Sequence, residues 1–291
     1  MSFFLQLLVA GIATGALYAL MAMGFVLVYR ATRVVNFAIG EFLLVGGYLT
    51  YTLNLVLPLP WAMVLTLPLA FAFGLLVERG FVRPLLGRNV VAVIMATIGL
   101  ALALDGAAQL AWGPDQKYLE GQLPVLTLAL GELILPSRSV WSLLLALPAA
   151  LALVYALKRS RYGVLVRAVA ESEVAALAMK IPAPRIVALV WGLSAALAAV
   201  GGALLAGLSG VGPHLIAMGL MVFPVAILGG MDSVGGALLA GMLVGVAESL
   251  SRGYLEALVP GITEASPFLI VLLVLLVRPY GLFGEREIER V

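Results

Sequence analysis

The chain has 291 residues, of which 63% are hydrophobic and 11% are charged, and its mean hydropathy is +1.15. Soluble domains contain roughly 45 to 50% apolar residues, so this composition excludes a soluble globular protein and indicates a polytopic membrane protein. With no cysteine and a single histidine, His214, the chain has no disulfide framework and too few ligands for a thiolate or histidine metal site. We expect no metal, no cofactor and no nucleic-acid partner.

Apolar segments long enough to approach the thickness of a bilayer follow one another along the chain. They lie at 3–29, 37–57, 61–77, 91–112, 140–157, 186–208, 215–228, 235–250 and 268–277. The sequence therefore predicts a single all-α domain, residues 1–291, that forms a membrane helix bundle of about eight to nine spans. The count depends on whether the glycine-rich segments near Gly40 and Gly229 cross fully or re-enter.

The positions of the cations predict the orientation of the bundle. If the amino terminus is outside, all of the 17 Lys and Arg residues lie on the inner side except Lys117, Arg138 and Arg252. Inner loops of membrane proteins carry an excess of Lys and Arg. We therefore expect a multi-pass protein in the bilayer with its amino terminus outside and its carboxyl terminus in the cytoplasm.

The largest outer segment, 113–139, contains the sequence PVLTLALGELILP. Its partial alternation of apolar residues around Gly131 and Glu132 suits either a small hairpin or an irregular loop.

The longest polar interruption on the inner side is 158–185, KRSRYGVLVRAVAESEVAALAMKIPAPR. Its apolar residues at the spacing of one helix stripe are Val174, Leu177, Ala178 and Ile181. Pro182 and Pro184 follow, and they end the helix because proline lacks the amide donor and clashes with the preceding turn. A short amphipathic helix of this kind suits either a position flat on lipid or a groove on a soluble partner.

Enzyme motifs are nearly absent from the sequence. No GxxxxGK[ST] phosphate loop, HExxH or GxSxG occurs. The segment 207–210, GLSG, resembles the GxSG of rhomboid intramembrane proteases, but the lone His214 lies a few residues along the same segment instead of on a separate helix. We therefore interpret GLSG as a loop of small residues, and we do not expect an enzyme.

Three acidic residues fall within apolar segments, where a charge is costly and points to function by default. Asp105, Glu248 and Glu41 could each pair with a hydroxyl, amide or backbone group between helices. For Asp105, which has Gln109 one turn away, we expect such a pairing. Glu41 begins a span within NFAIGE, a pattern that suits a broken or re-entrant helix.

A second glycine-rich break, LGGMDSVGG at 228–236, lies in the carboxyl half. Two interrupted spans, one in each half, predict a translocation path between the halves. Small residues also recur at the close-packing spacing of Gly11xxxGly15 and Gly241xxxGly245, which predicts tight helix crossings. The candidate residues for the path or its gate are Asn36, Gly40, Glu41, Thr97, Gly229, Gly230 and Ser233.

Several motifs together resemble a known family. GALYALMAMGFVLVYRATRVVNFAIGEFLLVGGY, MATIGLAL, RAVAESEVAALAMKIPAPRIVAL, LGGMDSVGGALLAGMLVGVAESL and RPYGLFG occur in this order. This order resembles the membrane permease subunit of branched-chain amino-acid ABC importers, the Liv type, nearer the H than the M subunit. The resemblance covers nearly the whole chain, and NFAxGE and RPxGLFG are its fairly specific elements.

The resemblance implies an importer in the bacterial-type cell (inner) membrane. Its other parts would be ATP-binding cassette subunits, a paralogous permease or a second copy of this chain, and a periplasmic or extracellular substrate-binding protein. The stretch 167–185 aligns with the family's cytoplasmic coupling loop. The resemblance therefore implies that contact with the ATPase is made by Arg167, Glu171, Val174, Ala175, Leu177, Ala178 and Ile181.

The sequence departs from the family pattern at three places. The variable position of NFAxGE is Ile39, the LGGxGS element reads LGGMDS, and the glycine common before the coupling-loop isoleucine is Lys180. Relatives in this family also move amides and urea, so the ligand stays open. The alternative function is a self-sufficient secondary carrier that uses Glu41 and Glu248 for proton or sodium coupling, and an intramembrane hydrolase is a distant third.

Overall fold

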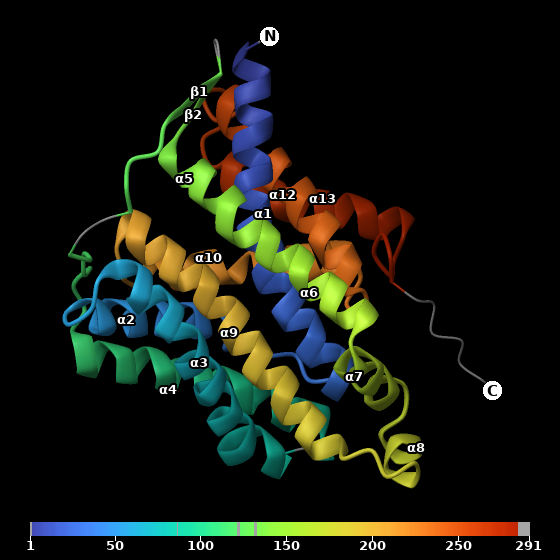
Figure 1. Cartoon of the computed structure of the whole chain (residues 1–291). Helices are drawn as coiled ribbons and strands as arrows, with labels where there is room; N and C mark the ends of the chain where they lie inside the picture. The colour runs from blue at the N-terminus through green and yellow to red at the C-terminus, as the bar shows by residue number, and fades with distance from the viewer. Residues whose placement is uncertain (1, 86, 121–122, 131–132, 285–291) are drawn as a thin grey trace. The chain divides into compact units, whose positions relative to one another are not determined.

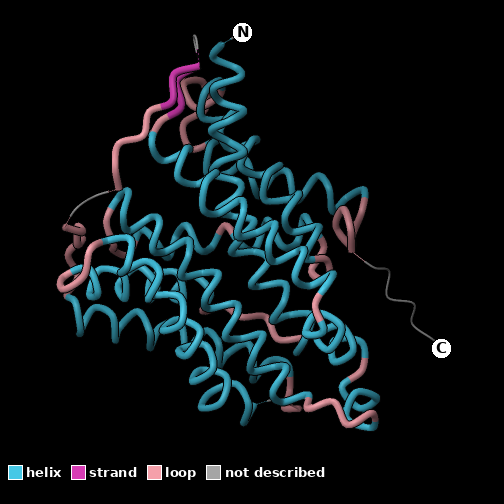
Figure 2. The backbone as a smooth tube through the Cα atoms, viewed as in Figure 1, coloured by secondary structure: helices cyan, strands magenta, loops and turns pink. Residues whose placement is uncertain are grey.

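A computed structural model describes residues 2–85, 87–120, 123–130 and 133–284, and nearly all of its regular structure is helical (Figures 1 and 2). Its contacts divide the chain into two compact units. The first contains Met1–Val26, Val125–Ala150 and Met221–Val291, and the second contains Leu27–Pro124 and Leu151–Leu220. Two of the boundaries between the units fall inside continuous helices, so this division does not decide how many domains the chain has. A single domain over residues 1–291 stays a prediction.

Six helical stretches of the described chain are long and apolar enough to cross a membrane, which confirms a helical membrane bundle. Their helices are α1 (Ser2–Thr32), α3 (Leu59–Val77) with its extension to Leu85, α4 (Val90–Trp112), α5 (Ser137–Trp141) continuing into α6 (Leu147–Arg159), α9 (Ala183–Ser209) and α12 (Val234–Tyr254). A π-helical turn, Glu78–Val82, extends α3, and another, Ser142–Ala146, joins α5 to α6.

Two of the remaining apolar segments form helices shorter than the sequence predicted. Helix α2 (Ile39–Asn54) has 16 residues, because the chain turns at Phe37 and Ala38 before it begins. The segment predicted at 215–228 forms two helices, α10 (His214–Leu220) and α11 (Val222–Gly229), separated by a turn at Met221. Pro224 explains this break because it cannot donate to the carbonyl one turn earlier. The last apolar helix, α13 (Ile262–Val277), begins earlier in the chain than the predicted span 268–277.

In the first unit, glycines let α1 and α12 approach until their backbones touch. A Cβ atom on Gly245 would lie 2.4 Å from the Gly11 oxygen, and one on Gly15 would lie 2.5 Å from the Gly241 oxygen. Ser249 Oγ also donates to the Leu7 carbonyl at 2.7 Å. The two glycine pairs singled out in the sequence are therefore a helix crossing, as predicted.

The segment predicted for the outer side forms a hairpin in the first unit (Figure 2). Strand β1 (Leu128–Leu130) pairs antiparallel with β2 (Leu133–Leu135), with Leu128 opposite Leu135. This confirms the hairpin alternative, although Gly131 and Glu132 at its turn lie outside the described residues.

The start of α13 is fixed by a carboxylate. Glu256 accepts hydrogen bonds from Gly261 N at 2.8 Å and Thr263 N at 3.0 Å. These bonds and one from the Thr263 hydroxyl hold the pKa of Glu256 below its ordinary value. The bonds occupy amide donors that the first turn of a helix leaves without partners inside the helix.

The second unit is built around α9, which packs against α2 and α3. Close approach again depends on glycine, because a Cβ on Gly46 of α2 would lie 2.4 Å from the Ala199 Cα. A Cβ on Gly74 of α3 would lie 2.5 Å from the Trp191 carbonyl oxygen. Between α2 and α3, the buried hydroxyls of Thr50 and Thr66 lie 2.9 Å apart.

We predict that Gly245→Ala lowers the free energy of unfolding by about 1 to 3 kcal/mol, because the new methyl group meets rigid backbone of α1. The matched control is Gly235→Ala at the start of the same helix, where a Cβ has open space. The control should leave stability unchanged or raise it by up to about 1 kcal/mol, since alanine is the better helix former. Thermal melting of both variants in one detergent tests this, and equal melting temperatures would contradict the crossing.

Candidate functional site

The break before α2 brings together four of the predicted path residues in the second unit. Asn36 is fully buried, and its Oδ1 accepts a hydrogen bond from Ala38 N at 3.1 Å. Thr97 of α4 is also buried, and its hydroxyl lies 3.1 Å from the Val35 carbonyl oxygen and 2.9 Å from that of Ile94. The Thr97 hydrogen bond thus holds the non-helical segment before α2 against α4 at Val35.

Gly40 lies where α2 meets α10. A Cβ on Gly40 would lie 3.1 Å from the Ile216 carbonyl oxygen, and a Cβ on Gly219 would lie 2.3 Å from the Gly40 Cα. Gly40 is therefore needed for packing whatever its role in transport. The sequence did not single out Gly219 as a packing residue, because an isolated glycine in an apolar segment does not indicate which helix packs against it.

Glu41 stands in the first turn of α2 and is 7% exposed. Its Oε2 has no hydrogen-bond partner among the described residues. The other two acids behave differently: Asp105 pairs with Gln109 at 3.1 Å, as predicted, and Glu248 pairs with Arg252. The structure thus separates Glu41 from the acids that have protein partners.

The second break belongs to the first unit, where its residues have packing and capping contacts. Gly230 has a φ of +95°, and a Cβ on Gly229 would lie 2.6 Å from the Gly236 carbonyl carbon. Ser233 caps α12, accepting from Gly236 N at 3.0 Å.

The carboxyl-terminal RPYGLFG element packs directly on this break. Leu282 N donates to the Leu228 carbonyl at 2.8 Å, and a Cβ on Gly230 would lie 2.4 Å from Gly284 N. The sequence did not predict the contact between these two motifs, because neither motif contains a pattern that indicates which segment packs against it.

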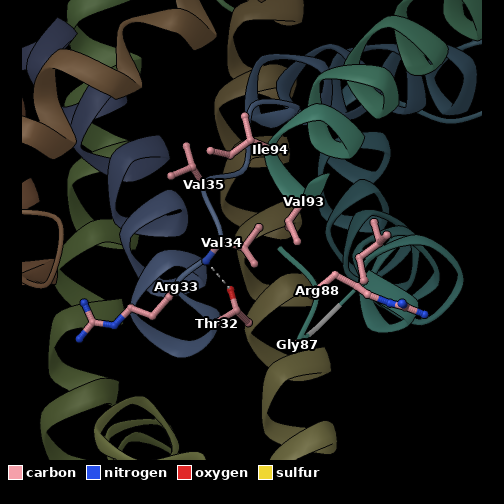
Figure 3. Close-up of a pocket in the computed structure, with 9 residues that line it drawn as sticks. Thr32, Arg33, Val34, Val35, Gly87, Arg88, Val93 and Ile94 are labelled. Atoms are coloured by element: carbon pink, nitrogen blue, oxygen red, sulfur yellow. Dashed lines mark hydrogen bonds between the residues drawn. The ribbon is translucent and has the colours of Figure 1, made fainter. Parts of the chain in front are cut away.

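A cavity of about 110 Å³ lies beside the break before α2 (Figure 3). Figure 3 shows that the Arg33 and Arg88 side chains point to opposite sides, whereas Val34 and Val93 lie between them. A second cavity, of about 290 Å³, shares part of this lining and extends from the end of α1 to the end of α7. Its charged and hydroxyl-bearing lining residues are Arg30, Thr32, Arg33, Glu171 and Ser172.

The segment 158–185 forms two short helices, α7 (Arg161–Glu171) and α8 (Glu173–Ala178) (Figure 1). The extended backbone of Ser172 separates them, and its hydroxyl accepts from Ala175 N at 3.2 Å. The predicted helix stripe is therefore shorter than expected, since Ile181 lies beyond the end of α8. Lys180, just beyond the end of α8, has a φ of 62°, a left-handed conformation that glycine adopts more easily.

The stripe of α8 faces outward. Val174 is 79% exposed and Leu177 is 50% exposed, and Ala175 and Ala178 are also exposed. Ala176, by contrast, is buried. The arrangement leaves an apolar surface on α8 that no described residue covers.

Two contacts hold the segment in place at its ends. Arg167 of α7 donates to the Leu157 carbonyl at 2.5 Å. Arg83, which pairs with Glu78, also donates to the Pro184 carbonyl at 3.3 Å, next to the start of α9. The exposed face of α8 is therefore carried by a segment that is anchored to the membrane helices.

Comparison with known proteins identifies the family of the chain. Residues 7–278 match the family model described as "Branched-chain amino acid transport system / permease component". The chain is 32% identical to the high-affinity branched-chain amino acid transport system permease protein LivH of Salmonella typhimurium, over 99% of this chain and 98% of that protein. It is also 32% identical to BraD, a permease protein of the same description from Pseudomonas aeruginosa, over the same shares of the two chains.

A third relative is the probable branched-chain amino acid transport permease protein LivH of Methanocaldococcus jannaschii, 30% identical over 92% of this chain and 89% of that protein. The family match and the full-length relatives lead to one conclusion: the chain belongs to the permease-component family of branched-chain amino acid transport systems.

Proposed function

We propose that this chain is the membrane-spanning permease subunit of an ATP-driven importer for branched-chain or other small amino acids or amides. Family membership supports the permease role, and the observation that carries the ATP-driven part is the exposed apolar face of α8. The sequence holds no phosphate loop, so ATP would be bound by partner chains.

The ATP-binding subunit is the partner proposed for the α8 face. Ala175 and Ala178 are small and exposed, so a partner groove can approach the helix backbone closely. To drive transport, the partner must bind the two conformations of the permease with different affinity, because equal affinity shifts no equilibrium. A paralogous permease or a second copy, and an external substrate-binding protein, complete the proposed complex.

The proposed topology has nine crossings, with the amino terminus outside and the carboxyl terminus in the cytoplasm. It adds α2, the pair α10 and α11, and α13 to the six long helices. This arrangement places the segment 158–185 and the Arg278 end of α13 on the same, positively charged side. In this topology the α8 face would lie on the cytoplasmic side, within reach of a cytoplasmic ATPase.

The proposed path runs past the break before α2, where Asn36, Gly40, Glu41 and Thr97 lie. The break near Gly229 would act on the path through packing, since Ser233 already serves as a helix cap. A secondary carrier driven by Glu248 is less well supported. That carboxylate is already occupied by Tyr18 at 2.8 Å and Arg252 at 2.6 Å.

The first functional prediction concerns the energy source. We expect the purified chain to hydrolyse no ATP, and the complex with its ATP-binding subunits to show hydrolysis that the substrate-binding protein stimulates. Proteoliposomes provide the measurement, with uptake of leucine followed in the same vesicles. Accumulation of leucine against a gradient by this chain alone would instead favour the secondary carrier.

The second functional prediction concerns docking. Ala178→Asp should leave membrane insertion intact, because the side chain is exposed, but it should reduce ATP-dependent uptake at least tenfold by placing a charge in an apolar contact. Gly80→Asp is the matched control, since it adds the same charge at an exposed position of the α3 extension where a side chain has open space. Normal uptake and normal assembly in the Ala178→Asp complex would show that α8 is not the docking surface.

A further inference from the structure

Three carboxylates are buried in the part of the chain that the structure describes, and only one lacks a cation. Glu78 pairs with Arg83 at 2.9 Å, and Glu248 pairs with Arg252 at 2.6 Å. Glu41 is 93% buried, forms no ion pair with a described residue, and has an Oε2 atom without any hydrogen-bond partner.

A buried carboxylate of this kind requires compensation. An isolated charge in a low-dielectric environment is strongly disfavoured, and intramembrane acids face a partner or a ligand pathway. The amino end of α2 supplies part of the compensation, because the helix dipole places partial positive charge near the first turn. The unpartnered oxygen still lacks a donor, so a group from outside the described chain has to provide one.

Asn36 presents the opposite problem at the same end of α2. Its Oδ1 accepts from Ala38 N, which fixes the orientation of the amide and leaves Nδ2 as the free donor. Nδ2 has no acceptor among the described residues, although Asn36 is fully buried. An unmade hydrogen bond at a buried amide is costly, so a ligand that brings an acceptor would be favoured here.

An unpaired acceptor and an unpaired donor at the same end of α2 fit the chemistry of one ligand. A proton or a sodium ion on Glu41 would leave the Asn36 amide unpaired, and a simple anion at Asn36 would leave the Glu41 oxygen unpaired. A zwitterion carries an ammonium donor and a carboxylate acceptor a few bonds apart, so it meets both needs. The residue that caps α2, Ala38, provides no side-chain acceptor for the first-turn amides, which also suit a carboxylate.

We propose that the amino end of α2 is a binding site for a zwitterionic α-amino acid during transport. Glu41 Oε2 accepts hydrogen bonds from the ammonium group, and Asn36 Nδ2 donates to the carboxylate. The proposal rests on the importer function proposed above, and it assigns substrate recognition to the permease itself. Gly40 packs against Ile216 of α10, so the proposed site lies beside α10.

The test is amino-acid binding by the transporter complex without its substrate-binding protein, in lipid nanodiscs. L-leucine is the probe, 4-methylpentanoate lacks its ammonium group, and isopentylamine lacks its carboxylate. Binding is followed by the shift in melting temperature in three states: without nucleotide, with ADP and with a non-hydrolysable ATP analogue. Leucine should stabilise the wild-type complex in at least one state, and neither analogue should do so at the same concentration.

Two variants and a control make the test specific to the site. Glu41→Gln should weaken leucine binding at least tenfold, because an amide cannot replace the charge that faces the ammonium group. Asn36→Ala should weaken it as well, whereas Glu41→Asp should retain part of the binding. Thr50→Val changes a buried polar side chain further along α2 whose hydrogen bonds are made to Gly46 and Thr66, and it should bind leucine like the wild type.

The outcomes separate this proposal from the importer function. Leucine binding by Glu41→Gln equal to that of the wild type, or no leucine shift in any state of the wild type, would overturn the site. The site would also be overturned if isopentylamine stabilised the wild type as strongly as leucine does, because the carboxylate that Asn36 is proposed to bind would then contribute nothing. If the wild-type complex with binding protein and ATP accumulates no amino acid, the importer function itself fails.

Discussion

A charge inside a membrane needs a partner, and this constraint explains how the polar residues of the chain are placed. Arg252 and Tyr18 satisfy Glu248, and Arg83 satisfies Glu78 at the end of α3. The Tyr18 hydrogen bond joins α1 to α12, whereas each of the two ion pairs forms within one helix or its extension. Glu41 is the exception among the described residues, and the proposed binding site at the amino end of α2 depends on it.

Glycine sets the second constraint, because the backbones of neighbouring helices approach to contact distance. The crossing of α1 with α12 and that of α2 with α9 both exclude a Cβ atom. Helices packed this closely move as rigid bodies more readily than they slide, since any shift would separate or overlap rigid backbone atoms. We infer that the conformational change of transport occurs at the interrupted places, before α2 and between α10 and α11, where backbone hydrogen bonding is already broken.

The sequence predicted the helical membrane bundle, the glycine crossing and the Asp105 pair, because each depends on local spacing or overall composition. It overestimated the length of the interrupted helices, since hydropathy does not register the turns at Phe37 and Met221. It also could not show that RPYGLFG packs on the Gly229 break or that Glu41 lacks a partner. Both facts depend on contacts between distant segments, which carry no periodic signal in one sequence.

The central claim, that α8 delivers the energy of ATP to the membrane helices, can be tested by site-specific cross-linking. The chain has no cysteine, so a single cysteine in place of Leu177 is the only thiol that the permease contributes. The account predicts that this cysteine cross-links to the ATP-binding subunit and is shielded from a water-soluble maleimide when that subunit is present. Equal labelling with and without the ATP-binding subunit, and no cross-link in any nucleotide state, would contradict it.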